Sequence, residues 1–198
     1  MKSALLAAAI LLAAQLSNAK GVHVKNVLIV YGSFAGSTSE IADSMKAALG
    51  RTGVTAYTVP ASGSTADLSP YDLVVIGSAI HGARPHPKVG EFVAANRAEL
   101  KRKKLAVFAA CITATSARED RRKATQAYPG LVAHGLSPVS TAVFAGKAPS
   151  SSWYGNLMGK LMLGITPGDY RDWKKIEDWA VSLLGWPSSS LTPGVNSA

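Results

Sequence analysis

The sequence predicts one doubly wound α/β domain, with a five-stranded parallel sheet and helices on both faces. Short apolar runs rich in β-branched residues alternate along the chain with stretches of helical apolar spacing, as in repeated strand–helix–strand units. The apolar runs are also uninterrupted, which is typical of parallel strands covered on both faces. A length of 198 residues, with 47% hydrophobic and 17% charged residues, suits a single globular core.

The first strand and the first helix carry the clearest signals. The strand is expected at residues 27–31, an apolar run that Gly32 ends. Ser37 and Thr38 then mark the start of a helix. An apolar stripe and closing glycines follow at Ile41, Met45, Leu49, Gly50 and Gly53.

The same alternation continues toward the C-terminus. Further strands are expected at residues 54–59, 73–76, 105–110 and 139–144, and helices at 87 to about 100, from about 117, and at 172–184. The last helix is expected to be capped by Asp172. The connection 60–71 is short and rich in Ser, Gly and Asp, so we expect a single turn there and no full crossover helix.

Both ends of the chain differ from this pattern. Residues 1–19 combine Lys2, an uncharged stretch rich in Ala and Leu, and small residues before Lys20, which is the layout of a secretory signal peptide. A retained N-terminal anchor also fits this stretch, so the expectation is an exported or membrane-anchored protein, on either side of the membrane. The domain is expected at residues 24–186, followed by a disordered tail at 187–198.

Charge and cysteine content narrow the function classes. The net charge of +9 suits an anionic partner, but no zinc-ligand spacing and no nucleic-acid-binding motif accompany it. We therefore expect neither a metal site nor a nucleic-acid partner. Cys111 is the only cysteine, so the chain cannot form an intramolecular disulfide.

The loop after the first strand carries the strongest chemical signal. In a parallel α/β sheet, ligands bind beyond the carboxyl ends of the strands. Here the sequence SFAGST places hydroxyls, a glycine and a helix start together, so that N–H and O–H groups can converge on an anion. The loop lacks the Lys of a nucleotide-triphosphatase loop and the glycines of a dinucleotide fingerprint, so a phosphate monoester fits best. The alternative is that Ser37 or Thr38 only caps the helix.

Two further loops are expected at the same edge of the sheet. Residues 77–85, after the third strand, have small side chains, as expected where backbone lies along a planar ring. Residues 111–115, after the fourth strand, are expected to cover the other edge of that ring. For Cys111 the alternative is the role of a small buried residue at a strand end.

At these residues the chain resembles flavodoxin-fold FMN proteins. The resemblance rests on SFAGST followed by Glu40-Ile41-Ala42, on YDLVVIGSAI, and on the positions around Cys111. It implies a flavodoxin-like sheet of strand order 2-1-3-4-5 and FMN as the cofactor. By position, it implies that the phosphate is wrapped by Ser33, Phe34, Ala35, Gly36, Ser37 and Thr38. It implies that the isoalloxazine is bordered by Ser78, Ala79, Ile80, His81, Gly82, Cys111, Ile112 and Thr113.

Two positions depart from this pattern. Ala35 stands where flavodoxins often carry a hydroxyl, and the third-strand loop has no aromatic residue to stack on the ring.

Two other segments resemble a narrower family, the menaquinone-dependent protoporphyrinogen IX dehydrogenases. They are HGARPHPKVGEFV, and WYGNLMGKLML with DYRDWKKIEDWA. This resemblance implies an FMN-dependent dehydrogenase of haem biosynthesis that oxidises a reduced tetrapyrrole and reduces a membrane quinone. His81, Arg84 and His86 are candidates for contacting substrate, whereas no catalytic acid or base is assigned.

The segment 153–163 has a helical apolar face with aromatics at one end. This pattern suits the substrate or peripheral contact with a membrane, and ordinary core packing is the alternative. The other functions compatible with the sequence are an electron carrier of the flavodoxin type and an NAD(P)H-dependent quinone reductase of the same fold.

Overall fold

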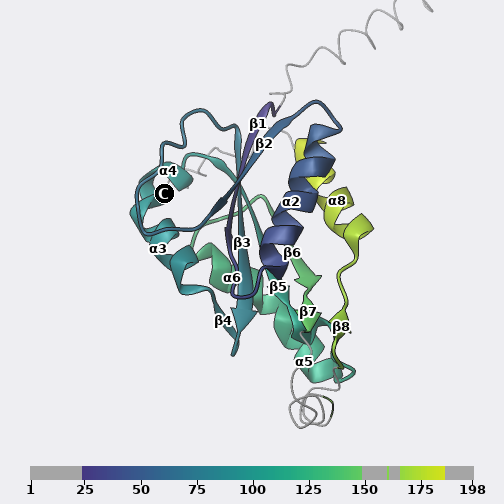
Figure 1. Cartoon of the computed structure of the whole chain (residues 1–198). Coiled ribbons are helices and arrows are strands. Elements are labelled where there is room, and N and C mark those ends of the chain that lie inside the picture. The colour runs from purple at the N-terminus through teal and green to yellow at the C-terminus, as the bar shows by residue number, and fades with distance from the viewer. Residues whose placement is uncertain (1–23, 149–159, 161–165, 186–198) are drawn as a thin grey trace, which may run out of the picture.

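A computed structural model describes residues 24–148, 160 and 166–185, and its centre is a parallel sheet (Figure 1). Its long strands lie in the order β2-β1-β3-β5-β6, and each pairs in parallel with its neighbour. This arrangement confirms the predicted doubly wound sheet of order 2-1-3-4-5. The bounds are β1 (Asn26–Gly32), β2 (Thr55–Pro60), β3 (Leu73–His81), β5 (Lys104–Cys111) and β6 (Ser140–Ala145).

Helices cover both faces of the sheet (Figure 1). On one face lie α2 (Ser37–Gly50) and α8 (Trp173–Ser182), and on the other lie α3 (Pro87–Ala95), α4 (Arg97–Leu100) and α6 (Tyr128–Ala133). Successive residues of a strand point to opposite faces, so Val27 and Ile29 join the core under α2 while Leu28 and Val30 join the core under α3. This double burial explains why the central strands β1, β3 and β5 are largely apolar.

The last helix begins as the sequence predicts. The Asp172 carboxylate accepts a hydrogen bond from the backbone N–H of Lys175 at 3.0 Å, which satisfies a donor at the helix start. The predicted cap is confirmed. After Ser182 the chain tightens into a 3₁₀ turn, η3 (Leu183–Gly185).

The predicted loop at 77–85 is wrong, because β3 continues to His81 and folds back as a hairpin. Gly82 and Ala83 form the turn with φ of 56° and 61°, and β4 (Arg84–Pro85) pairs antiparallel with the end of β3. Two consecutive positive φ values are typical of the tight turns that match strand twist. The backbone of β3 therefore keeps strand geometry up to the hairpin turn.

Two predicted helices are interrupted. The helix expected from residue 87 to about 100 breaks at Asn96, whose side-chain amide donates to the carbonyls of Phe92 and Ser64 and accepts from the N–H of Ala66. These bonds compete with continued helix formation. The helix expected from about residue 117 consists of α5 (Glu119–Ala124), the 3₁₀ turn η2 (Thr125–Ala127) and α6.

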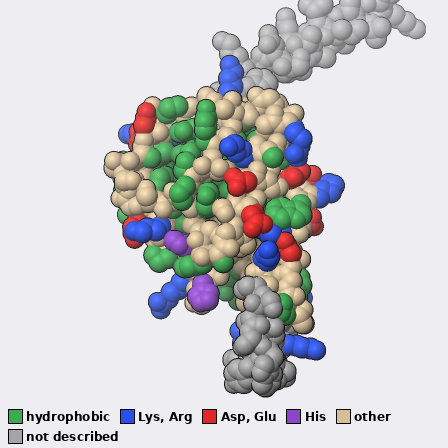
Figure 2. Space-filling view, viewed as in Figure 1, with side chains coloured by type: hydrophobic (Ala, Val, Ile, Leu, Met, Phe, Trp, Pro, Cys, Tyr) green, Lys and Arg blue, Asp and Glu red, His purple; other side chains and the backbone are tan. Residues whose placement is uncertain are grey.

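The connection between β2 and β3 forms no helix, as predicted from its composition. Residues 61–72 run as an irregular segment, in which Leu68 alone is fully buried among the large apolar side chains. On β2, Tyr57 and Val59 therefore remain 48% and 37% exposed. Figure 2 shows apolar side chains gathered on this part of the surface.

Three sequence predictions lie outside the described residues: the leader at 1–19, the tail at 187–198, and the apolar segment 153–163 apart from Lys160. The chain on either side of that segment is described. There β7 (Lys147–Ala148) pairs antiparallel with β8 (Gly168–Asp169). Across the ranges that the structure describes, no helix is long and apolar enough to cross a membrane, and no His, Cys, Asp and Glu side chains group as metal ligands.

Candidate functional site

The loop Ser33–Thr38, called the phosphate loop from here on, joins β1 to α2 at the carboxyl edge of the sheet. The Ser33 hydroxyl oxygen accepts hydrogen bonds from the backbone N–H groups of Gly36 at 3.0 Å and Thr38 at 3.3 Å. Gly36 has φ of 86°, a left-handed conformation that glycine adopts readily, and it is the N-cap of α2. The Ser33 hydroxyl thus satisfies a first-turn N–H of α2 and neither Ser37 nor Thr38 caps the helix, so the alternative that one of them serves only as its cap is wrong.

Thr38 supplies the sharpest test of whether this loop suits a phosphate. Its side chain is fully buried, and its hydroxyl has no hydrogen-bond partner among the described residues. An unpaired buried hydroxyl is costly, and a strong acceptor such as a phosphate oxygen removes the cost. The space beside Gly36 is open, since a Cβ built there would meet no atom within 4 Å. The loop therefore has a donor that a phosphate monoester would satisfy, and room beside Gly36.

The end of β3 contributes backbone more than side chains. Ser78 is fully buried, and its hydroxyl accepts from the His86 N–H at 2.8 Å while donating to the Ala79 carbonyl. Its side chain thus holds the hairpin closed. Ala79 and Ile80 are half-buried, and His81 and Gly82 are exposed at the hairpin end, so these four remain the predicted border for a planar ring.

Aromatic rings connect the phosphate loop to this hairpin. The Phe34 ring is 55% exposed, and its centroid lies 4.5 Å from that of His86 and 5.7 Å from that of His81. His86 is held against β1, because a Cβ on Gly32 would come within 2.7 Å of the His86 Cβ. Figure 2 shows histidine side chains at the surface where the hairpin lies. Phe34 thus presents an exposed aromatic face beside a hairpin that has no Trp, Tyr or Phe of its own.

The third predicted segment follows β5. Cys111 ends that strand with 3% exposure, as the alternative of a small buried residue at a strand end predicts, and burial raises the pKa of its thiol. The thiol is therefore protonated at neutral pH. The chain then turns through η1 (Ile112–Thr115), in which Ile112 and Thr113 are half-buried. Because β1, β3 and β5 are adjacent and parallel, all the predicted site residues lie at one edge of the sheet.

Arg171 is a residue of this site that the sequence did not reveal. Its side chain is only 2% exposed, and it pairs with Asp169 and, at 2.8 Å, with Glu40 in the first turn of α2. Its Nη1 donates to the carbonyl of Ser37 in the phosphate loop at 3.2 Å. The guanidinium also lies 4.4 Å from the centroid of the Trp173 ring. Since Glu40 and Arg171 are far apart in sequence, no local pattern could have joined them.

The pair Asp169–Arg171 gives the fold a pH dependence. Hydrogen bonds from Arg171 lower the pKa of Asp169 from 3.8 to about 2. A carboxyl group whose pKa falls on folding stabilises the native state above its unfolded pKa, and that stabilisation is lost as pH falls through the folded value. We expect Asp169→Asn to be less stable than wild type above pH 4, with the difference shrinking between pH 4 and pH 2. Urea unfolding across this range checks it, and a constant difference would contradict the assignment.

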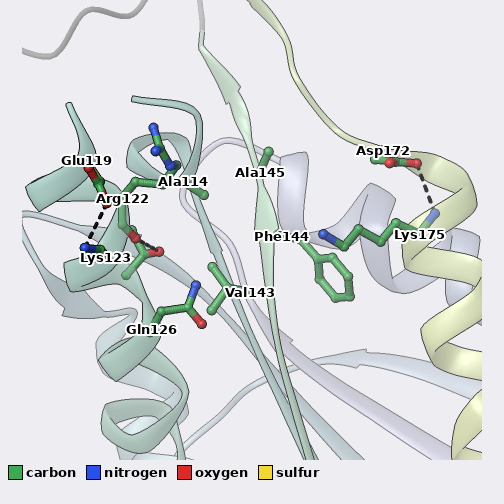
Figure 3. Close-up of a pocket in the computed structure, with 11 residues that line it drawn as sticks. Ala114, Glu119, Arg122, Lys123, Gln126, Val143, Phe144, Ala145, Asp172 and Lys175 are labelled. Atoms are coloured by element: carbon green, nitrogen blue, oxygen red, sulfur yellow. Dashed lines mark hydrogen bonds and ion pairs between the residues drawn. The ribbon is translucent and has the colours of Figure 1, made fainter. Parts of the chain in front are cut away.

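A groove runs beside the site along the outer edge of β6, between α5 and α8 (Figure 3). Its two cavities have volumes of about 440 and 520 Å³. Val143 and Phe144 line it from opposite sides of β6, and the Lys175 side chain reaches from α8 toward β6. Arg122 and Lys123 stand on the opposite wall, where Lys123 pairs with Glu119. We call this the β6 groove. Ala114 of η1 lines it, directly after the residues predicted to border the ring.

Comparison with known proteins agrees with this geometry. The flavodoxin domain family matches residues 28–162, which is more than half of the chain, so the protein belongs to this family. No curated protein sequence matches it significantly. The family match confirms FMN as the cofactor, which the resemblance implied and which carries the phosphate monoester predicted from the loop.

Solved flavodoxins share the architecture. A short-chain flavodoxin associated with a bacterial microcompartment is 13% identical, with a TM-score of 0.52 over 80% of this chain and 96% of its own. Oxidised flavodoxin 2 from Bacillus cereus is 22% identical, with a TM-score of 0.50 over 80% of this chain and 97% of its own. At such identities the likeness shows the fold alone.

Proposed function

We propose that the protein is an FMN-dependent oxidoreductase that removes hydrogen from protoporphyrinogen IX, or a related reduced tetrapyrrole, and passes it to a quinone. Oxidation of protoporphyrinogen IX to protoporphyrin IX removes six electrons and six protons, so one porphyrinogen would reduce three quinones to quinols. Bound FMN supplies the ability to accept and donate these electrons. The protein supplies binding and orientation.

The observation that carries this proposal is the β6 groove next to η1. Its apolar lining at Ala114, Val143 and Ala145 suits part of an apolar macrocycle, and Lys175, Arg122 and Lys123 suit carboxylate groups at the macrocycle's edge. The sequence resemblance of residues 81–93 and of the segment around 153–163 supports the same substrate. We further propose that the quinone is drawn from a membrane that the protein contacts peripherally, and that residues 1–19 export or anchor the chain.

The role of the chain in FMN binding follows from the phosphate loop. The Thr38 hydroxyl would donate to the phosphate, next to the Gly36 and Thr38 N–H groups that Ser33 holds in the loop, and the α2 dipole would favour its negative charge. The ring would lie between the β3 hairpin and η1. No described side chain is assigned as acid or base.

The test is an anaerobic assay of the FMN-loaded protein with protoporphyrinogen IX and a menaquinone analogue. We expect quinone-dependent formation of protoporphyrin. We expect Lys175→Glu to raise KM for the porphyrinogen about tenfold, because it replaces a favourable charge with a repelling one. FMN affinity should stay unchanged.

Lys174→Glu is the matched control. It makes the same charge change one residue earlier on α8, where Lys174 lines neither cavity, although its partner Asp178 lines the second. We expect its KM to equal that of wild type. Bound FMN without porphyrinogen oxidation would reject the substrate and leave the electron-carrier function standing. Equal effects of the two variants would reject the β6 groove as the substrate site.

A further inference from the structure

The guanidinium of Arg171 lies behind the phosphate loop and contacts its backbone. Arg171 Nη1 donates to the Ser37 carbonyl, which belongs to the same peptide group as the Thr38 N–H. A trans peptide group is planar, so its C=O and N–H point in opposite directions. Fixing the carbonyl from behind therefore aims the Thr38 N–H into the loop, where it donates to Ser33 Oγ. A cation on the carbonyl also polarises the peptide and strengthens that N–H as a donor.

We call the contact of Arg171 with the Ser37–Thr38 peptide group the tether. Arg171 is held rigidly enough to make this contact. Its Nε donates to one Asp169 oxygen at 2.8 Å and its Nη2 to the other, which is the two-point geometry that fixes a guanidinium plane. Trp173 stacks nearby, and the side chain is 2% exposed. The position of the Ser37–Thr38 peptide is thus set by a segment near the C-terminus of the fold.

Arg171 also offsets an unfavourable charge at the loop. Glu40 lies in the first turn of α2, where a carboxylate suits the helix dipole but repels a bound phosphate. The guanidinium pairs with that carboxylate at 2.8 Å. Removing the guanidinium would leave both Glu40 and Asp169 without their cation, close to the phosphate loop.

We propose that Arg171 is a positioning residue for the FMN phosphate, acting through the Ser37–Thr38 peptide group and through Glu40. This inference rests on the proposed FMN-dependent function. It assigns to residue 171 a role in cofactor selection, because a flavin that lacks the phosphate gains nothing from the tether.

The experiment compares FMN with riboflavin, which carries the same ring without the phosphate. For Arg171→Gln we expect the dissociation constant for FMN to rise about tenfold, the size expected when a charge-assisted bond is lost. We expect the constant for riboflavin to change by less than about twofold, because the ring does not contact the tether. In the apoprotein, the ¹⁵N amide shift of Thr38 should move.

Arg51→Gln is the matched control. Arg51 also joins α2 to α8, through Glu177, but at the opposite end of α2 from the phosphate loop. We expect it to leave the FMN-to-riboflavin ratio and the Thr38 amide shift at their wild-type values. This control distinguishes the effect of losing an Arg–Glu ion pair from the effect of losing the contact between Arg171 and the phosphate loop.

Equal weakening of FMN and riboflavin by Arg171→Gln would overturn the inference, as would no change in either ligand. If that variant does not unfold cooperatively, Arg171→Lys takes its place. It keeps the charge but cannot make the forked contacts, so a smaller loss specific to FMN is expected. Wild-type protein that fails to bind FMN would instead reject the proposed function itself, which this comparison detects before any variant is measured.

Discussion

Replacing Thr38 by Val is expected to weaken FMN binding by about 1–3 kcal/mol, because the bound phosphate loses a hydrogen bond to a buried hydroxyl. The apoprotein should remain at least as stable as wild type. Val matches the shape of Thr, and the hydroxyl that it removes has no partner among the described residues. Fluorescence titration with FMN and urea unfolding of the apoprotein measure the two effects.

Lower FMN affinity without lower apoprotein stability makes the result specific. Damage to the core would lower both FMN affinity and apoprotein stability, whereas loss of a phosphate contact lowers affinity alone. Thr38→Ser is the control, since it keeps the hydroxyl and should retain most of the affinity. Unchanged FMN binding in Thr38→Val would show that the Thr38 hydroxyl does not bind the phosphate.

Replacing Gly77 by Ala is expected to destabilise the protein by about 1–3 kcal/mol, the usual cost of forcing a methyl group into a packed core. A Cβ at this position would lie 2.1 Å from the Phe108 Cζ. Phe108 cannot move aside easily, because it is fully buried and packs near Phe144 and Trp179. Urea unfolding of the apoprotein measures the loss.

Gly50→Ala is the control for this variant. A Cβ at Gly50, the last residue of α2, would meet no atom within 4 Å, so this change should leave stability unchanged or raise it by up to about 1 kcal/mol. Combining Gly77→Ala with Phe108→Leu should cost less than the sum of the single changes, since the smaller side chain makes room. Strict additivity would mean that Phe108 does not cause the effect.

The centre of the sheet could be predicted from the sequence because each of its strands, β1, β3 and β5, carries a local signal. A fully buried parallel strand must be apolar on both faces, and runs such as residues 27–31 and 73–76 satisfy this requirement without help from the rest of the chain. The hairpin after β3 was not predicted, because it has no such local signal. Small residues from Gly77 onward suggest a loop, and nothing local signals that Ala83 takes a positive φ. The break at Asn96 likewise depends on partners in the distant segment 61–72.

In the candidate site, too, local features could be predicted, whereas contacts between distant segments could not. The phosphate loop could be predicted because its donors are neighbours in sequence and a strand and a helix fix its ends. The ring contacts of Phe34 with His81 and His86, and the pairing of Arg171 with Glu40, arise only when separate segments meet in the folded chain. Their residue types carry no local signal of that meeting.

The missing helix between β2 and β3 makes the sheet unevenly protected. Most of the sheet lies between two helical layers, but β2 is an edge strand packed under α2 on one face and left open at Tyr57 and Val59 on the other. Opening this edge exposes little additional apolar surface, so it costs much less free energy than opening β3 or β5. We therefore expect the amide protons of β2 to exchange with solvent through local opening, and those of the central strands to exchange only through global unfolding.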